Sequence, residues 1–433
     1  MNDAPFDDAF GGPPVQGGAN RATDDAPPHA APFLAPSLAG AALGLAFRGL
    51  DLPAILALRE GTAWRHLRGD RSDRFAHLLS VADLDAHLAT DAARAPRVAM
   101  ADSRRAGSAA VPEDLFARED GRIEPARLHA LFDGGATLVV SQFHESHRPL
   151  ALFCRGLERA FLHPVQSNIY LTPGGKHGPD GGGAQGFRPH FDTHDVLVLQ
   201  VAGRKRWRIW PGMPLPLPTR RTPWHNRYAP EGAPAEVELA PGDALYVPRG
   251  VVHDAAAVGD ESSLHATIGL LEPSAAEALR TALDAAEEED PAFRRATPTW
   301  RPDEPEALAD LVADLAARLT HPDHLSRLRA RLLDRLAGER LAMSARGLIA
   351  APPDPARPVA LAETVHHHVL ATPDGAAVLR AAGVEERLSA GDLDALAAME
   401  DGVPPAEIGA EALAERLYRA GVLLGRSPEA PTS

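Results

Sequence analysis

The chain has 433 residues, of which 45% are hydrophobic and 24% are charged, so it has the composition of a globular protein that is too long for one ordinary core. Its formal net charge of −15 argues against nonspecific binding of nucleic acid, because contacts to phosphate dominate that affinity. The single cysteine, Cys154, excludes an internal disulfide framework and favours a reducing compartment, so we expect a cytoplasmic protein.

The amino-terminal part of the sequence predicts a disordered tail followed by helices. Residues 1–35 are rich in Gly, Pro and Ala, and they lack the basic start and apolar stretch of a signal peptide. No apolar run approaches the ~20 residues that a membrane span requires, so no membrane association is expected. From Leu50 through Leu88 apolar residues recur at near-helical spacing, which predicts helix there, within a helical or mixed region over 36–135.

A series of short strands is predicted over residues 136–272. The strands are expected at 137–140, 168–172, 195–201, 206–210, 236–239, 243–247 and 264–270. A helix is expected at 145–161, a Gly-rich loop at 173–186, and a hairpin that turns at Ala202-Gly203. Many short strands with Gly/Pro turns, and no helix between Tyr170 and Leu270, indicate a barrel or sandwich rather than a parallel α/β fold.

After Pro273 the pattern changes to helix. Apolar stripes from Leu308 to Leu319 and from Leu325 to Leu336 predict a helical pair within 273–350. A Pro-rich linker over 351–358 precedes a module over 359–433. This module is predicted to contain, in order, a strand at 364–370, helices at 390–399 and 410–421, and a final strand at 422–424. That order resembles a winged helix, but its second helix carries Glu411 and Glu415 as well as Arg416 and Arg419, so no direct nucleic-acid binding is expected.

Two histidines and one aspartate form the most informative pattern. His190 and Asp192 are two residues apart, and alternate residues of a strand point to the same side, so the two side chains converge. A His-x-Asp pair alone is weak evidence in a chain with 19 histidines. Downstream, however, the turn Pro241-Gly242-Asp243 and the strand after it lead to His253, which favours a metal site. Two imidazoles and one carboxylate can occupy one face of an octahedral ferrous ion and leave three positions open.

These residues, together with the segment from Leu197 to Arg208, resemble the JmjC ribosomal oxygenases. That family consists of cupin-fold protein hydroxylases that depend on Fe(II) and 2-oxoglutarate. The resemblance covers residues from about 35 to 270 and is weaker beyond. It implies an α+β protein with a double-stranded β-helix (cupin, or jelly-roll) core, N-terminal helices, a helical dimerisation region and a C-terminal winged-helix-like domain. It also implies a homodimer.

The resemblance implies roles for individual residues. The expected ligands of Fe(II), and thus the catalytic centre, are His190, Asp192 and His253. Lys205 falls where the family places the basic residue that pairs with the distal carboxylate of 2-oxoglutarate, and a dianion inside a barrel needs such a cation. The alternative for Lys205 is a solvated charge beside Arg204 and Arg206. The residues expected to line the cosubstrate pocket are Asn168, Tyr170 and Thr267, although a cross-strand or core hydrogen bond would explain each equally well.

The other histidines in or near the predicted strands are expected to have roles other than metal binding. His194 shares strand parity with His190 and Asp192, but the resemblance assigns ligation to His253, so a supporting or structural role is favoured for His194. The run His366-His367-His368 has no neighbouring Cys or carboxylate cluster, which favours a surface or structural strand. Packing or entrance roles are expected for His144 and His147. For the loop pair Trp224-His225 the alternatives are contact with substrate and packing within the loop, of which packing is favoured.

The leading hypothesis is an Fe(II)- and 2-oxoglutarate-dependent oxygenase that hydroxylates a protein side chain, His or Arg of a ribosomal protein. A second hypothesis keeps the chemistry and assigns a small molecule or a peptide as the substrate. A third, from another class, is a noncatalytic metal-binding cupin scaffold. Lys205 separates the third from the others, because a protein that binds no cosubstrate has no use for a cation at that position.

Overall fold

The computed structural model describes residues 37–177, 183–219, 222, 230–297, 305–339, 349, 351–372, 376–381 and 383–426. The chain divides into two units, residues 1–35 and 36–433. The predicted tail and the pair Trp224-His225 lie outside the described residues, as does part of the Gly-rich loop.

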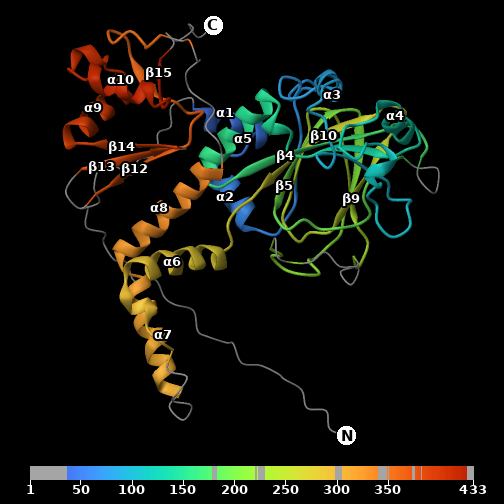
Figure 1. Ribbon diagram of the computed structural model, residues 1–433. Helices are drawn as coiled ribbons and strands as arrows, with labels where there is room; N and C mark the ends of the chain where they lie inside the picture. The colour runs from blue at the N-terminus through green and yellow to red at the C-terminus, as the bar shows by residue number, and fades with distance from the viewer. Residues whose placement is uncertain are drawn as a thin grey trace. The chain divides into compact units, whose positions relative to one another are not determined.

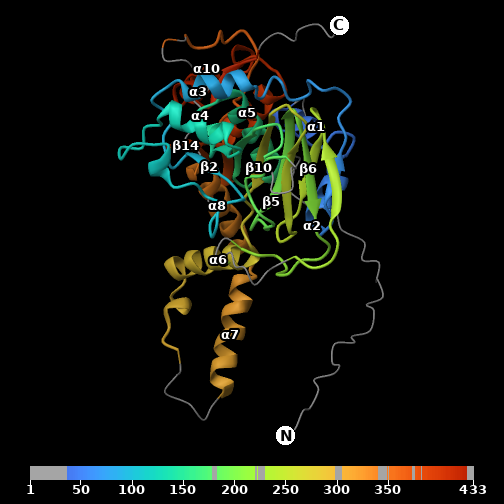
Figure 2. The same cartoon turned by 90° about the vertical axis from the view of Figure 1, so that its right-hand side faces the viewer.

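Two antiparallel sheets form the centre of the larger unit (Figures 1 and 2). One has seven strands in the order β1-β8-β5-β10-β4-β3-β2, and the other has three in the order β7-β6-β9. The strands of the first are β1 (Arg65–Leu67), β2 (Val98–Ala101), β3 (Thr137–Val140), β4 (Val165–Thr172), β5 (Asp195–Ala202), β8 (Ala244–Val247) and β10 (Ser263–Leu270). Those of the second are β6 (Arg204–Ile209), β7 (Ala235–Leu239) and β9 (His253–Val258).

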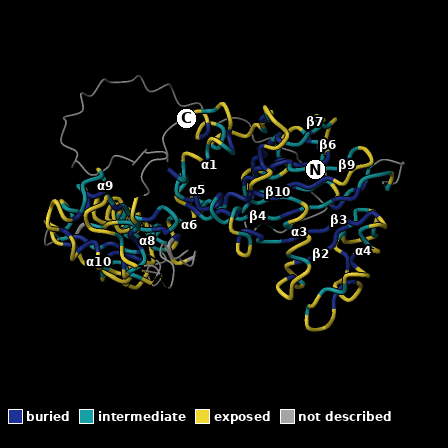
Figure 3. The backbone as a smooth tube through the Cα atoms, turned by 90° about the horizontal axis from the view of Figure 1, so that it is seen from above, coloured by how far each residue is buried: buried dark blue, intermediate teal, exposed yellow. Residues whose placement is uncertain are grey.

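In the seven-stranded sheet, β5 and β10 are buried at most of their positions, whereas buried and half-buried residues alternate along most of β4 (Figure 3). Side chains of a strand alternate between the faces, and β5 illustrates the consequence. Leu197 and Leu199 belong to a core shared with the N-terminal helices, whereas Val196 and Val198 pack with Trp207 of the smaller sheet. These helices are α1 (Leu38–Ala46), α2 (Leu52–Glu60), α3 (Val81–Leu88), α4 (Pro125–Asp133) and α5 (Arg148–Phe161). The α+β class with a cupin-type β core is thereby confirmed.

The predicted hairpin between β5 and β6 is wrong. The two strands are consecutive, but β5 pairs with β8 and β10, while β6 pairs with β7 and β9. The connection at Gly203 carries the chain from one sheet to the other. Gly203 has a φ of +59°, and a Cβ there would lie 2.2 Å from the backbone oxygen of Ser262, so only glycine fits this crossing.

Gly203→Ala is therefore expected to destabilise the fold, because the added methyl meets backbone atoms in a conformation that L-residues rarely adopt. We expect a loss of about 2–4 kcal/mol in the free energy of unfolding. Gly259→Ala is the matched control, since Gly259 also has a positive φ (+84°) but no atom within 4 Å of its added Cβ. Urea denaturation of both variants measures the difference, and equal losses would contradict the steric explanation.

The helix predicted from Leu50 to Leu88 is interrupted. Only α2 and α3 are helical there, and strand β1 lies between them, paired with β8. Gly69, which follows β1, packs so closely against Gly242 that a Cβ would lie 2.4 Å from its carbonyl oxygen. The turn before β8 therefore holds this segment out of a helix. Asp243 strengthens the contact by accepting a hydrogen bond from the Gly69 amide at 2.8 Å.

The C-terminal part contains the predicted helical pair and a smaller α+β module. The helices of the first part are α6 (Ala275–Glu289), α7 (Pro305–Leu319) and α8 (Pro322–Glu339). The elements of the module are β11 (Val359–Leu361), β12 (His367–Ala371), β13 (Ala377–Ala381), β14 (Val384–Leu388), α9 (Ala390–Glu400), α10 (Glu411–Arg419) and β15 (Leu423–Gly425). Within the described residues, no helix is both long and apolar enough to cross a membrane.

Candidate metal centre

His190, Asp192 and His253 converge at one point of the β core. His253 is the first residue of β9, which the sequence analysis did not predict as a strand. His190 and Asp192 lie on an extended segment just before β5 rather than within a strand. Two backbone hydrogen bonds join His190 to His253: the His190 amide donates at 3.0 Å and the His253 amide at 2.7 Å. Backbone hydrogen bonds thus hold His190 and His253 side by side. Their side chains are placed by this pairing rather than by the loop that precedes His190.

The distances within the triad suit a single ion. One nitrogen or oxygen atom from each residue lies within 4.8 Å of the other two. Nε2 of His253 is 3.5 Å from Oδ2 of Asp192. Atoms bound to one metal at ~2 Å on one face of an octahedron are roughly 3 Å apart, so the triad must close slightly to bring all three atoms into contact with an ion.

The hydrogen bonds of the two imidazoles fix which nitrogen faces the site. Nδ1 of His190 lies 2.8 Å from the carbonyl oxygen of Arg188, and Nδ1 of His253 lies 3.0 Å from that of Val251. A carbonyl only accepts, so Nδ1 of each ring carries the proton. When such a ring is neutral, its Nε2 is left with a lone pair, which is the form of histidine that binds a metal.

The electrostatics agree with this protonation state. Burial and the neighbouring His190 hold the pKa of His253 below its usual value, so this imidazole is neutral at pH 7. Burial alone would raise the pKa of Asp192, but His253 and His190 outweigh it and keep the carboxylate ionised. Two neutral nitrogens and one anionic oxygen on one side of a site are the donor set of a facial triad for Fe(II). The residues therefore fit the ion that the sequence predicts.

A cavity of about 240 Å³ opens on the triad between the two sheets. Among its lining residues are all seven predicted site residues, namely Asn168, Tyr170, His190, Asp192, Lys205, His253 and Thr267. The cavity is also lined by Thr137, Gly186, Phe187, His194, Val196, Val198, Trp207, Asp254, Ala255 and His265. The structure thus brings all the predicted residues to one place.

Lys205 is buried and faces the cavity, so the alternative of a solvated charge is wrong. Its side chain is 4% exposed, whereas the flanking Arg204 and Arg206 are exposed and contact Glu238. Nζ donates to Oγ1 of Thr172 at 2.9 Å. Among the described residues no carboxylate lies within ion-pair distance of Nζ, and burial lowers the pKa of Lys205 to about 7. A buried cation beside hydroxyls and without an anion fits an acidic ligand.

Asn168 and Tyr170 are held together by hydrogen bonds. The Gln142 amide donates to Oδ1 of Asn168 at 3.0 Å, and the Asn168 side chain hydrogen-bonds to Tyr170. Burial and the nearby Asp192 raise the pKa of Tyr170, so its phenol stays protonated. Thr267 of β10 pairs in register with Asn168 of β4. These contacts support a structural role for Asn168, and the residue also lines the cavity.

Two cavity residues were missed by the sequence analysis. His265 lies two positions before Thr267 on β10, so both side chains point to the same face, and this parity was the available signal. Trp207 lies two positions after Lys205 on β6 and shares its face in the same way. His265 belongs to no local motif, and Trp207 was treated only as part of the segment from Leu197 to Arg208, which is why neither was singled out.

Asp254 was also missed, and it ties the cavity wall to the chain before His190. It is buried at the second position of β9, where Nε of Arg208 donates to Oδ1 at 2.8 Å. The side-chain amide of Gln185 donates to Oδ2 at 2.9 Å. Because Gln185 lies next to the last residue of the Gly-rich loop, this contact positions the chain that leads to the metal ligands.

The histidines that were not expected to bind metal lie in other settings. His194 lines the cavity, and a Cβ added at Gly269 would come within 2.8 Å of its Nε2, so the ring occupies the space left by that glycine. His366 is buried, with Nε2 2.8 Å from Oε2 of Glu158 in α5, so of the two expected settings, surface and structural, it has the structural one. Nε2 of His147 is 2.9 Å from the carbonyl oxygen of Leu78, a packing role as expected.

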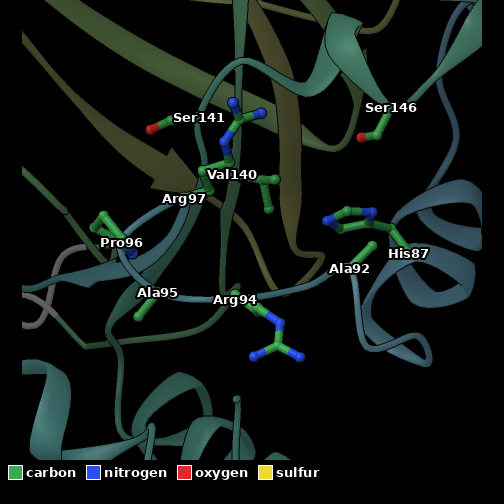
Figure 4. Close-up of a pocket in the computed structure, with 9 residues that line it drawn as sticks. All are labelled: His87, Ala92, Arg94, Ala95, Pro96, Arg97, Val140, Ser141 and Ser146. Atoms are coloured by element: carbon green, nitrogen blue, oxygen red, sulfur yellow. The ribbon is translucent and has the colours of Figure 1, made fainter. Parts of the chain in front are cut away.

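A larger cavity of about 440 Å³ lies beside β2 and β3 (Figure 4). Its nine lining residues include a single histidine, His87, and no carboxylate. Arg97 is already paired with Glu145 at 2.6 Å, and the guanidinium of Arg94 points away from that of Arg97. This cavity offers no metal-ligand set, so the smaller cavity is the candidate site.

Comparison with known proteins agrees with this placement. Residues 140–278 match the family model of the JmjC domain. The bifunctional lysine-specific demethylase and histidyl-hydroxylase NO66 of Drosophila persimilis is 36% identical over 151 residues, 34% of this chain and 20% of the relative. Ribosomal oxygenase 2 of Bos taurus is 35% identical over 167 residues, 36% of this chain and 32% of the relative. The chain thus spans at most about a third of the length of these curated relatives.

A solved structure extends the likeness to most of the chain. E. coli ycfD aligns with 87% of this chain and 99% of its own length, with a TM-score of 0.51 and 18% sequence identity. At that identity the likeness concerns the fold, and it includes elements outside the matched JmjC domain.

Proposed function

Since the chain is a JmjC-domain protein related to the ribosomal oxygenases, we propose that it is an Fe(II)- and 2-oxoglutarate-dependent oxygenase. One observation carries the proposal: the triad of His190, Asp192 and His253 and the buried, carboxylate-free Lys205 line the same cavity. A metal-binding scaffold without a cosubstrate would gain nothing from burying that charge, which costs free energy. The cavity therefore suits a metal and a dicarboxylate together.

The proposed division of labour follows from the positions of the side chains. His190, Asp192 and His253 hold Fe(II) through Nε2, a carboxylate oxygen and Nε2. Lys205 binds the distal carboxylate of 2-oxoglutarate, with Thr172 orienting its ammonium group. When bound, Fe(II) would activate dioxygen, which is the oxidant, and 2-oxoglutarate would supply two electrons through its decarboxylation to succinate, so that one oxygen atom is left for the substrate. The apolar wall formed by Val196, Val198 and Trp207 excludes water from the reacting atoms.

We propose a protein substrate, His or Arg of a ribosomal protein. The names of the relatives, a histidyl-hydroxylase and a ribosomal oxygenase, support the histidine and the ribosomal target, and arginine follows only from the resemblance of the sequence to the family. We further propose that the chain forms a homodimer through α7 and α8, where Leu308, Val312 and Leu325 are exposed. The module over 359–433 is proposed to be winged-helix-like. Light scattering by the full chain measures the proposed dimer directly.

The substrate proposal is tested by intact-mass spectrometry of ribosomal proteins from wild-type cells and from cells that lack the gene. One ribosomal protein is expected to be heavier by one oxygen atom in the wild type alone. A mass lower by a methylene unit in the wild type would instead indicate demethylation, which the name of the NO66 relative also includes. Identical masses throughout would contradict a ribosomal substrate and favour a small molecule or a free peptide.

A further inference from the structure

A closed loop of six aromatic rings surrounds the cavity. His190 contacts Phe187, Phe187 contacts Tyr170, and Tyr170 stacks on His265 with centroids 4.9 Å apart and planes 7° apart. From His265 the loop continues through Trp207 to His253, which returns to His190. The metal ligands form one side of the loop, and His265 and Trp207 belong to the other side.

His265 and Trp207 each have a buried polar atom without a partner among the described residues. These atoms are Nδ1 of His265 and the indole nitrogen of Trp207. His265 is only 3% exposed, so bulk water does not solvate its ring. Buried polar groups in folded proteins are nearly always hydrogen-bonded, and an exception in a cavity wall points to a missing ligand or ion.

Most of the unused hydrogen-bonding groups in this part of the cavity wall are N–H donors. The indole N–H of Trp207 can only donate, and Lys205 has three N–H groups, of which Thr172 accepts one. Burial and the nearby Lys205 hold the pKa of His265 well below its usual value, so its imidazole is neutral and carries one N–H. A wall with one cation and two neutral rings suits an acceptor with several lone pairs, and a carboxylate is such a group.

We propose that His265 is a positioning residue, which donates a hydrogen bond to the carboxylate of 2-oxoglutarate that Lys205 binds and so sets the orientation of the cosubstrate. The inference rests on the proposed function, whose cosubstrate it assumes. Stacking on Tyr170 and the edge contact with Trp207 lock the imidazole plane, so the hydrogen bond costs little rotational freedom. Lys205 thus contributes the positive charge that binds the carboxylate, and the hydrogen bond from His265 fixes the orientation of that carboxylate.

The test measures ligand binding to the full chain loaded with Mn(II), by titration calorimetry. The probes are N-oxalylglycine, which has both ends of 2-oxoglutarate, and oxalate, which has only the metal-chelating end. His265→Phe keeps an aromatic ring against Tyr170 and removes both nitrogens. N-oxalylglycine is expected to bind about tenfold more weakly to His265→Phe, as the loss of one hydrogen bond to a charged group predicts, while oxalate binding stays unchanged.

Two further variants separate hydrogen bonding from packing. His265→Asn places an amide near the position of Nδ1 and should recover most of the lost affinity. Phe187→Leu, a matched change in the same aromatic loop, removes no nitrogen and should leave the ratio between the two probes unchanged. A thermal melt of each variant confirms that it is folded.

The outcomes distinguish this inference from the proposed function. If the wild type fails to bind N-oxalylglycine in the presence of Mn(II), the oxygenase proposal fails. If the wild type binds it and His265→Phe binds it equally well, only the role of His265 is overturned. A loss of both probes in His265→Phe, with no recovery in His265→Asn, would also overturn that role, since it indicates disruption of the metal site.

Discussion

Asp192→Asn is expected to abolish metal binding while leaving the fold intact. The amide has nearly the shape of the carboxylate but lacks its negative charge, and it is the only anionic ligand of the triad. Changes to residues that merely support metal ligands typically weaken metal binding 10- to 100-fold, so loss of the charged ligand should cost more than about 100-fold. Because this variant loses the metal, its turnover of 2-oxoglutarate should fall below detection.

Thermal unfolding measures this loss without any assay of activity. A metal that binds only the folded state raises the melting temperature, so Mn(II) should stabilise the wild type and leave Asp192→Asn unchanged. His194→Ala is the control, because His194 lines the same cavity but is not a ligand in the proposed site. If Mn(II) stabilised Asp192→Asn as much as the wild type, the triad would not be the metal centre.

The triad was predictable from sequence because its information is local. His190 and Asp192 are two residues apart, and His253 follows a turn and a strand that are legible in the sequence. The extended segment holding the first two is not a ladder strand, but its backbone has the same side-chain parity. The two side chains therefore converge as predicted although the segment is not a strand of a sheet. The prediction required only that alternate residues point to the same side.

The features that sequence reasoning missed depend on contacts between distant segments. β5 and β6 look like a hairpin, but their partners β8, β9 and β10 come later in the chain and compete for pairing. Lys205, by contrast, was predicted, but only from the resemblance: it lies between Arg204 and Arg206, and its parity with Trp207 is the one local sign that it points inward. His265 acquires its setting from Tyr170 and Trp207, which are on other strands. Such proximity has no signature in a single sequence.

Lys205 makes the binding of 2-oxoglutarate dependent on pH. In the cosubstrate-free protein burial lowers the pKa of Lys205 to about 7, so above pH 7 most chains have a neutral amine in the cavity. A bound carboxylate favours the ammonium form and raises this pKa. Between the two pKa values the complex binds one proton more than the free protein, so affinity must fall as pH rises, by up to about tenfold per pH unit.

Calorimetric titration of the Mn(II)-loaded protein at pH 8, in two buffers with different enthalpies of ionisation, measures the proton uptake. The wild type should take up close to one proton for each 2-oxoglutarate bound. Lys205→Met should bind 2-oxoglutarate on the order of a hundredfold more weakly at pH 6.5, because the buried carboxylate loses its charged partner. Its affinity should not depend on pH in this range, and its affinity for Mn(II) should be unchanged.

Lys205→Arg separates charge from titration. A guanidinium keeps its proton at every pH in this range, so the variant should retain a cation for the carboxylate while losing the proton uptake and the decline of affinity above pH 7. If the wild type and Lys205→Arg showed the same pH profile, the dependence would have to arise elsewhere in the cavity. A loss of Mn(II) affinity in Lys205→Met equal to its loss of 2-oxoglutarate affinity would remove Lys205 from the cosubstrate site, because it would mean that the lysine supports the triad instead.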